Sequence, residues 1–313
     1  MKEENLIFII SQPRSGSTYL QNLLSNNDET NTCSEPWLLL YFSNQLKPNL
    51  FEAKFDNKIA IAAFSDYLEK HPSINFNEEQ KTFLLNLYKP LFEGYKFAID
   101  KTPRYWEIMD EIIALFPNCK MIILKRNPLN VAKSIIKTWN INSIPKLSYY
   151  KRDLLFGPKQ IHAFSEKHST NHNVYTLRYE DLIKDTAEEI KKVYEWIGIT
   201  YHLGVPDTSN NKKYKGKFGD PYQNSEKPFG EIKTENKQKA LNKMFKDFLI
   251  GYENYLGSEF LIAYGNYKVI EVKQKQTRAF NYFMHFRNNG KNGINLKKEF
   301  KYLFKECFYR LFK

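Results

Sequence analysis

The sequence predicts an α/β fold, an open parallel sheet with helices on both faces. Short apolar runs, beginning with LIFIIS at 6–11, recur along the chain and alternate with longer stretches of helical pattern. Apolar runs without polar alternation are typical of strands buried on both faces, and strand–helix alternation is typical of parallel sheets. The 313 residues, 42% of them hydrophobic, suffice for one large core.

The expected elements follow in order along the chain. Strands are predicted at 6–11, 95–100, 120–126 and 174–182. Helices are predicted at about 17–24, 105–117, 127–139, 186–199 and 234–256. The third of these helices has Asn127 as its N-cap and Pro128 in its first position, which is a strong start signal. The fourth opens with acidic residues that suit the positive end of the helix dipole.

The remaining segments define the domain organisation. Residues 36–91 are aromatic and helical in pattern without a clear strand, so we expect a helical cap inserted into the sheet domain. Residues 203–230 hold many turn-forming residues and predict a long surface loop. We therefore expect a domain over 1–267 followed by an extension over 268–313.

The basic charge of the chain is concentrated in this extension. The net charge is +12, and residues 268–313 contribute twelve Lys or Arg against three Glu, while the rest has 35 basic and 32 acidic residues. The charge thus belongs to an appendage and not to a nucleic-acid-binding fold. At the C-terminus, apolar residues share one helical face: Phe300, Leu303, Phe304, Cys307, Phe308, Leu311 and Phe312.

A basic amphipathic helix of this kind predicts binding to an anionic membrane surface. The alternative is a helix docked on its own domain or in a homodimer. The sequence has no run of eighteen apolar residues, no signal-peptide pattern at its start, and three widely spaced cysteines. We expect a cytoplasmic protein, peripheral at the inner membrane surface if the extension binds lipid.

The stretch IFIISQPRSGSTYLQNLL, from Ile7, has the layout of a phosphate-binding loop between a strand and a helix. Gly16 lets backbone amides approach an anion at a helix N-terminus. Ser15, Ser17 and Thr18 add hydroxyl groups, and Arg14 adds a guanidinium that can hold two oxygens. The lysine of the nucleotide-hydrolysing motif GxxxxGK[ST] is missing, and a capped turn with an exposed arginine is the plain alternative.

A second arginine ends another predicted strand. Arg126 closes KMIILKR, and Ser134 follows eight residues later in the next helix. Ligands of open parallel sheets bind at the carboxyl ends of strands, where both Arg14 and Arg126 are expected. Ser134 by itself would be read as an ordinary helix residue.

Together these motifs, over roughly residues 5–200, resemble the sulfotransferases that use 3′-phosphoadenosine 5′-phosphosulfate (PAPS) and release 3′-phosphoadenosine 5′-phosphate (PAP). The resemblance implies that the PRSGST loop, from Arg14 to Tyr19, holds the 5′-phosphosulfate. It implies that Arg126 and Ser134 hold the 3′-phosphate. Tyr179, in the RYEDL segment, would lie against the nucleotide, and Lys227 would close over it. A sulfuryl group carries less charge than a phosphoryl group, so no metal is expected.

The transfer also needs a base for the acceptor hydroxyl. The six histidines (His71, His162, His168, His172, His202 and His285) lie outside the matched motifs. The segment TCSEPW resembles that of tyrosylprotein and bacterial relatives, which implies Glu35 as the general base, against a solvated loop glutamate. Lys101 in DKTP, together with Arg14, is implied to stabilise charge on the leaving oxygen.

We therefore expect a sulfotransferase that acts on a hydroxyl group, with a carbohydrate or lipid-linked glycan of polysaccharide biosynthesis as the acceptor. Two alternatives remain at this point. One is a kinase-like P-loop phosphotransferase, which is disfavoured because no lysine follows Gly16 and no Walker-B aspartate is evident, although Asp100 ends a strand. The other is a membrane- or nucleic-acid-binding module driven by the basic extension.

Overall fold

The computed structural model describes residues 2–51, 53, 55–207, 214, 219, 241–268, 277–286 and 304. The chain divides into two compact units, Met1–Arg126 with Gly157–Lys233, and Asn127–Phe156 with Thr234–Lys313. This division differs from the predicted boundary after residue 267. Its cause is that α14 (Lys243–Leu256) and α16 (Arg278–His285), on either side of that boundary, pack against each other.

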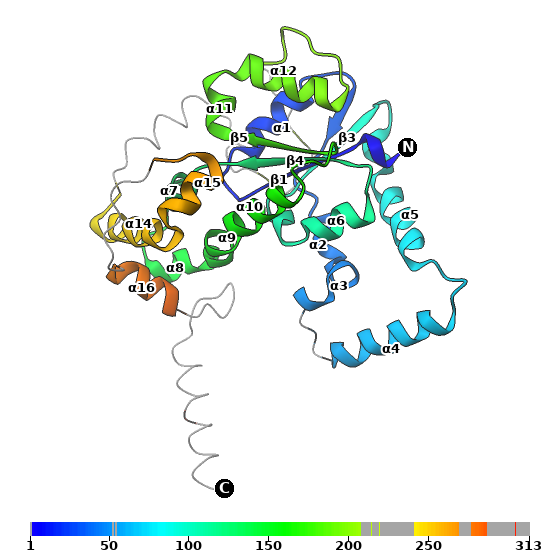
Figure 1. Ribbon diagram of the computed structural model, residues 1–313, viewed down its shortest axis with the longest axis horizontal. Helices are drawn as coiled ribbons and strands as arrows, with labels where there is room; N and C mark the ends of the chain where they lie inside the picture. Colours follow the sequence, from blue (N-terminus) through cyan, green and yellow to red (C-terminus); the bar gives the residue numbers. More distant parts are fainter. Residues whose placement is uncertain are drawn as a thin grey trace. The chain divides into compact units, whose positions relative to one another are not determined.

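The first unit is built on a five-stranded sheet in which every pair of neighbouring strands is parallel. The spatial order is β2-β3-β1-β4-β5, with β1 at the centre (Figure 1). The strands are β1 (Leu6–Ser11), β2 (Thr30–Thr32), β3 (Phe97–Lys101), β4 (Lys120–Lys125) and β5 (Val174–Arg178). The predicted open parallel sheet is confirmed, and the three-residue edge strand β2 is an addition to it.

Both faces of β1 are covered, which explains its unbroken apolar run. Ile7 and Ile9 belong to a core cluster with side chains of α1 (Ser17–Ser25) and α12 (Thr186–Ile197). Phe8 points to the other face, because neighbouring side chains of a strand alternate. Its ring lies 6.1 Å from the ring centroids of Tyr105 and Phe116. All six residues of β1 are therefore buried.

The helices of this unit mostly follow the prediction. The remaining ones that flank the sheet are η1 (Glu3–Asn5), η4 (Pro103–Glu107), α6 (Met109–Leu115), α10 (Gly157–Lys167) and α11 (Tyr179–Lys184). The predicted strand at 174–182 ends at Arg178, and Tyr179 begins α11 instead. Glu180 and Asp181 lie in the first turn of α11, where acidic side chains favour a helix start.

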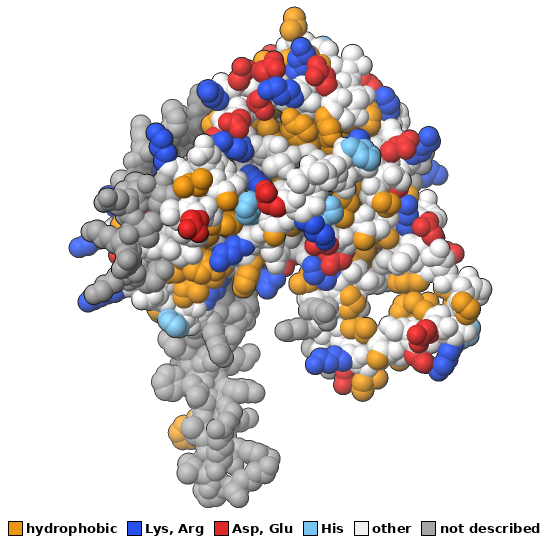
Figure 2. Space-filling view, in the orientation of Figure 1, with side chains coloured by type: hydrophobic (Ala, Val, Ile, Leu, Met, Phe, Trp, Pro, Cys, Tyr) orange, Lys and Arg blue, Asp and Glu red, His pale blue; other side chains and the backbone are white. Residues whose placement is uncertain are grey.

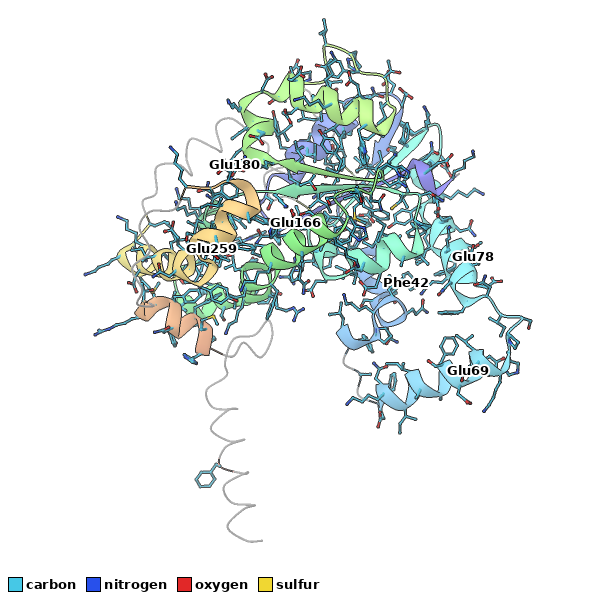
Figure 3. The ribbon with its side chains drawn as sticks, in the orientation of Figure 1. Phe42, Glu69, Glu78, Glu166, Glu180 and Glu259 are labelled. Atoms are coloured by element: carbon cyan, nitrogen blue, oxygen red, sulfur yellow. The ribbon has the colours of Figure 1, made fainter. Side chains whose placement is uncertain are left out.

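The stretch predicted as a cap is helical, with no strand among its described residues. It contains α2 (Leu38–Tyr41), α3 (Ser43–Leu46), η2 (Pro48–Leu50), α4 (Asn57–Lys70), α5 (Phe76–Tyr88) and η3 (Lys89–Phe92). Helix α4 has no buried residue. Figure 2 shows hydrophobic side chains exposed on this part, and Figure 3 labels Glu69 and Glu78 on α4 and α5.

The second unit is helical among its described residues. It contains α7 (Pro128–Thr138), α8 (Ile144–Leu147), η5 (Ser148–Tyr150), α9 (Lys151–Leu155), α14, α15 (Ser258–Gly265) and α16. Asn127 caps α7 by accepting a hydrogen bond from the Leu129 amide, as predicted. In the part of the chain that the structure describes, no helix is both long and apolar enough to span a bilayer.

The start of the predicted extension packs inside this unit. Phe280 and Phe283 of α16 are buried, and the Phe283 ring centroid lies 4.9 Å from that of Phe248 on α14. A Cβ atom on Gly251 would overlap Phe280, so glycine in the middle of α14 allows this close approach. The Phe280 and Phe283 side chains of α16 are thus covered by protein. Residues 287–303 and 305–313 lie outside the described residues.

Candidate active site

The loop after β1 leads directly into α1. Arg14 and Gly16 have backbone φ angles of 69° and 94°, both in the left-handed region. Such a conformation costs a non-glycine residue energy and is concentrated at functional sites. Gly16 is the N-cap of α1 and supplies no side-chain cap. The amides of the first helical turn can therefore bind an anion, with help from the helix dipole.

A buried hydroxyl in this loop supports the same interpretation. Ser15 is 1% exposed, and its Oγ atom has no hydrogen-bond partner among the described residues. Buried hydroxyls in folded proteins are almost always hydrogen-bonded, so an oxygen-rich ligand would satisfy this one. Ser17 and Thr18, in the first turn of α1, are also buried.

Arg126 reaches this loop from the end of β4. Its Nη1 atom donates a hydrogen bond of 2.8 Å to the backbone oxygen of Arg14, across 112 residues of sequence. Its guanidinium carbon lies 4.3 Å from the centroid of the Tyr179 ring, a cation–π contact. The Arg126 side chain thus reaches the backbone of the loop that carries Arg14, as the pairing of β1 with β4 allows.

Tyr179 lies against the loop from the start of α11, next to Glu180, which Figure 3 labels. A Cβ atom on Gly16 would overlap its ring. Burial raises the pKa of the Tyr179 phenol, and the positive charges of Arg126 and Arg14 oppose this rise. Both guanidinium charges therefore act on the same partly buried ring.

A second pair of predicted residues meets at the same edge of the sheet. Lys101 ends β3 and is paired in register with Ile9 of β1. Glu35 follows β2, whose partner is also β3. The Nζ atom of Lys101 lies 2.7 Å from Oε1 of Glu35, with the two side chains 1% and 13% exposed. Glu35 is thus a largely buried member of an ion pair, and not a solvated loop glutamate.

The neighbour of Lys101 faces the opposite side of the sheet. Asp100 is fully buried and accepts hydrogen bonds from the hydroxyls of Tyr88 (2.6 Å), Thr102 (3.1 Å) and Tyr105 (2.8 Å). Burial raises the pKa of Asp100 to about 6, and these hydrogen bonds oppose the rise. Sequence analysis assigned Asp100 no part in a sulfotransferase site.

The structure also places a histidine beside the residue that precedes Arg126, although all six histidines lie outside the matched motifs in the sequence. His162 on α10 has its Nδ1 atom 3.4 Å from Nζ of Lys125, the residue before Arg126. It also lies 3.7 Å from Glu166, which Figure 3 labels. Burial and the charge of Lys125 lower the pKa of His162. No spacing signal could reveal this contact, because α10 was not predicted.

The remaining predicted residues are Tyr19, Ser134 and Lys227. The Tyr19 hydroxyl lies 3.1 Å from Oγ1 of Thr186, so its ring packs between α1 and α12. Ser134 is half-buried on α7 and belongs to the second unit. Lys227 lies outside the described residues. The ligand roles of these three residues stay predictions.

These features define a parallel α/β protein with an uncapped helix N-terminus after β1, an arginine after β4 that is hydrogen-bonded to the loop after β1, and a largely buried Lys–Glu pair. A model of the sulfotransferase family matches residues 6–202, and the chain belongs to that family.

Individual relatives are more distant. Nodulation protein NoeE of Sinorhizobium fredii (strain NBRC 101917 / NGR234) is 26% identical over 229 residues, which are 65% of this chain and 53% of NoeE. The chain thus spans about half the length of that relative.

Two solved structures are similar at lower identity. A sulfotransferase domain from the curacin biosynthetic pathway is 19% identical, with a TM-score of 0.48, over 69% of this chain and 82% of its own. Mouse sulfotransferase SULT7A1, crystallised with PAP, is also 19% identical, with a TM-score of 0.38, over 64% of this chain and 61% of its own.

Proposed function

We propose that this protein transfers a sulfuryl group from PAPS to a hydroxyl group of an acceptor, with Glu35 as the general base. The observation that carries the proposal is the hydrogen bond between Arg126 and the backbone of Arg14. It brings the Arg126 guanidinium to the backbone of the loop at the uncapped N-terminus of α1, where a cationic group beside the first amides of the helix favours an anionic ligand.

The residues present fit such a donor, which would supply the activated sulfuryl group. The amides of the α1 N-terminus, the unsatisfied Ser15 hydroxyl and the Arg14 guanidinium would hold the 5′-phosphosulfate. Arg126 would hold the 3′-phosphate together with Ser134. The Tyr179 ring, stacked on Arg126, offers a flat surface to the nucleotide. We expect the bound donor to need no metal, since arginine, hydroxyl and amide groups provide the positive potential.

The Glu35–Lys101 pair would act on the acceptor and the leaving group. Glu35 would take the proton of the acceptor hydroxyl as the oxygen attacks sulfur in line with the breaking bond. Lys101, with Arg14, would stabilise the negative charge that develops on the leaving phosphate oxygen. The Lys101 ammonium lies 2.7 Å from Oε1 of Glu35, and Oε2, which lies 3.4 Å from Trp37 Nε1, is the oxygen that we assign to the acceptor.

A carbohydrate acceptor suits the surface next to Glu35. Trp37 and Tyr41 are 36% and 84% exposed, and Trp37 Nε1 lies 3.4 Å from Oε2 of Glu35. Exposed aromatic rings offer flat faces to sugar rings, whereas Phe42 packs against Phe83 at 5.4 Å. Membrane binding by residues beyond α16, a homodimer and a cytoplasmic location stay predictions.

The kinase-like alternative is disfavoured by the surroundings of Asp100. Both oxygens of that carboxylate accept hydrogen bonds from buried hydroxyls. A Mg²⁺ ligand in a phosphotransferase must instead face the bound phosphates. The loop after β1 also lacks the lysine that such enzymes use.

Isothermal titration calorimetry with PAP in the presence of EDTA tests the proposal. We expect binding without metal, and we expect Arg126→Ala to weaken it by about 10- to 100-fold, because charge-assisted hydrogen bonds to the 3′-phosphate are lost. The matched control is Arg278→Ala, an exposed arginine of α16. Binding of ATP that depends on Mg²⁺, with no binding of PAP, would favour the kinase-like alternative.

Gly16→Ala is expected to destabilise the protein and also to weaken PAP binding. Alanine in this left-handed conformation would lower the free energy of unfolding by about 1–2 kcal/mol, and its Cβ would also displace the Tyr179 ring. Gly198→Ala is the control, since Gly198 has a φ angle of 86° but no atom within 4 Å of an added Cβ. Thermal unfolding and calorimetry should show lower Tm for both variants and weaker PAP binding for Gly16→Ala alone. Equal PAP affinity in the two variants would contradict the role of the loop.

A further inference from the structure

The segment that follows Glu35 is held by hydrogen bonds to two hydroxyl groups, which belong to residues just after the end of β3. The Trp37 amide donates a hydrogen bond of 3.3 Å to Oγ1 of Thr102, and the Leu39 amide donates one of 3.1 Å to the hydroxyl of Tyr105. Trp37 is the N-cap of α2 and has a left-handed φ angle of 53°. For a bulky residue this conformation is strained, so it persists only where neighbouring contacts hold it.

Asp100 sets the direction of both hydrogen bonds. A hydroxyl group has one proton, and Thr102 and Tyr105 each give theirs to the Asp100 carboxylate. Their oxygens are then left as acceptors that face the two backbone amides. A neutral amide in place of the carboxylate would itself donate hydrogen bonds and would disturb this arrangement.

The same short segment carries Glu35. Only one residue separates Glu35 from Trp37, and the indole Nε1 of Trp37 lies 3.4 Å from Oε2 of Glu35. Moving the Trp37 and Leu39 amides would therefore move the Glu35 carboxylate away from Lys101, which is fixed in β3 and buried. A displacement of about 1 Å at a reacting group can reduce the rate by about 100-fold.

We propose that Asp100 is a positioning residue for catalysis, which acts through Thr102 and Tyr105 to hold Glu35 in place. This inference rests on the proposed role of Glu35 as the base. Asp100 faces Tyr88, Thr102 and Tyr105 in the core, and the positive charge of Lys101 acts on it. It touches no reacting group itself.

A matched pair of tyrosine variants separates positioning from core stability. Both Tyr88 and Tyr105 are fully buried and donate to the same Asp100 oxygen, but only Tyr105 also accepts from the segment that carries Glu35. We expect both Tyr88→Phe and Tyr105→Phe to lower Tm, and Tyr105→Phe to lower it more, because it also leaves the buried Leu39 amide without its acceptor. We expect Tyr105→Phe to lower kcat by about 10-fold with PAP affinity unchanged, and Tyr88→Phe to keep kcat within about twofold. Equal kcat in the two variants would overturn the inference.

A double-mutant cycle with Glu35→Gln completes the test. Because Tyr105 acts through Glu35, Tyr105→Phe should cause no further loss of kcat in the Glu35→Gln background. A full additional loss there would show that Tyr105 acts independently, and the inference would fail. If Glu35→Gln by itself leaves kcat unchanged, the proposed base is wrong, whatever the tyrosine variants show. Asp100→Asn should reproduce the Tyr105→Phe pattern where that variant folds.

Discussion

Glu35→Gln is expected to lower kcat by about 10²- to 10⁴-fold, the usual contribution of a general base. Glutamine keeps the shape of the side chain and can still accept a hydrogen bond from Lys101, but it cannot take a proton from the acceptor. PAP affinity is expected to stay within about twofold, because the nucleotide site that we propose consists of the loop and Arg126 and does not include Glu35. The variant should thus separate catalysis from donor binding.

The measurement is the transfer of labelled sulfate from PAPS to a panel of hydroxyl-bearing carbohydrates, with calorimetry for PAP. His162→Asn is the matched control, because His162 is the other candidate base that the structure places near the site, beside Lys125. We expect its kcat to remain within a few-fold of the parent protein. If His162→Asn abolishes transfer while Glu35→Gln does not, the base has been assigned to the wrong residue.

Lys101→Met is expected to lower kcat by about 10²- to 10³-fold and also to destabilise the protein by about 3–5 kcal/mol. The loss of activity follows from removing a positive charge at the leaving oxygen. The loss of stability follows because Glu35, only 13% exposed, would be left without its ionic partner. Methionine is chosen because it retains most of the buried volume of lysine.

Urea unfolding and the same transfer assay measure these two effects. Lys167→Met is the control, because Lys167 is also 2.7 Å from a carboxylate, that of Asp110, but both side chains are more than half exposed. Lys167→Met should lower the free energy of unfolding by less than about 1 kcal/mol, because exposed ion pairs contribute little to stability. The double variant Glu35→Gln with Lys101→Met should recover part of the stability without recovering activity. A double variant that is less stable than Lys101→Met would contradict the account of the pair.

The central strands and the phosphate loop could be predicted from the sequence because their signals are local. β1 and β4 are unbroken apolar runs, and Asn127-Pro128 marks the start of α7. The three-residue strand β2 has no such run, so its place beside β3 was not predicted. The end of β5 was predicted four residues late, because TLRYEDL contains no glycine or proline to mark the change from strand to helix.

The candidate site could be predicted only as far as its motifs extend. Arg14, Arg126 and Glu35 were identified from segments that resemble those of relatives. The pairing of Glu35 with Lys101 spans 66 residues, and the contact of Lys125 with His162 spans 37. Such contacts depend on strand order and helix placement, which no local pattern specifies. The hydroxyl network of Asp100 was missed for the same reason, although the adjacent Asp100 and Lys101 at a strand end were a signal.

The most direct test of the account is a crystal structure of the protein in complex with PAP. We predict that the 5′-phosphate lies on the amides of the α1 N-terminus, within hydrogen-bond distance of Ser15 and Arg14. We predict that the 3′-phosphate contacts Arg126 and that the Glu35 carboxylate faces the position of the transferred group. A nucleotide bound elsewhere, or one held by only one of the two arginines, would contradict the account.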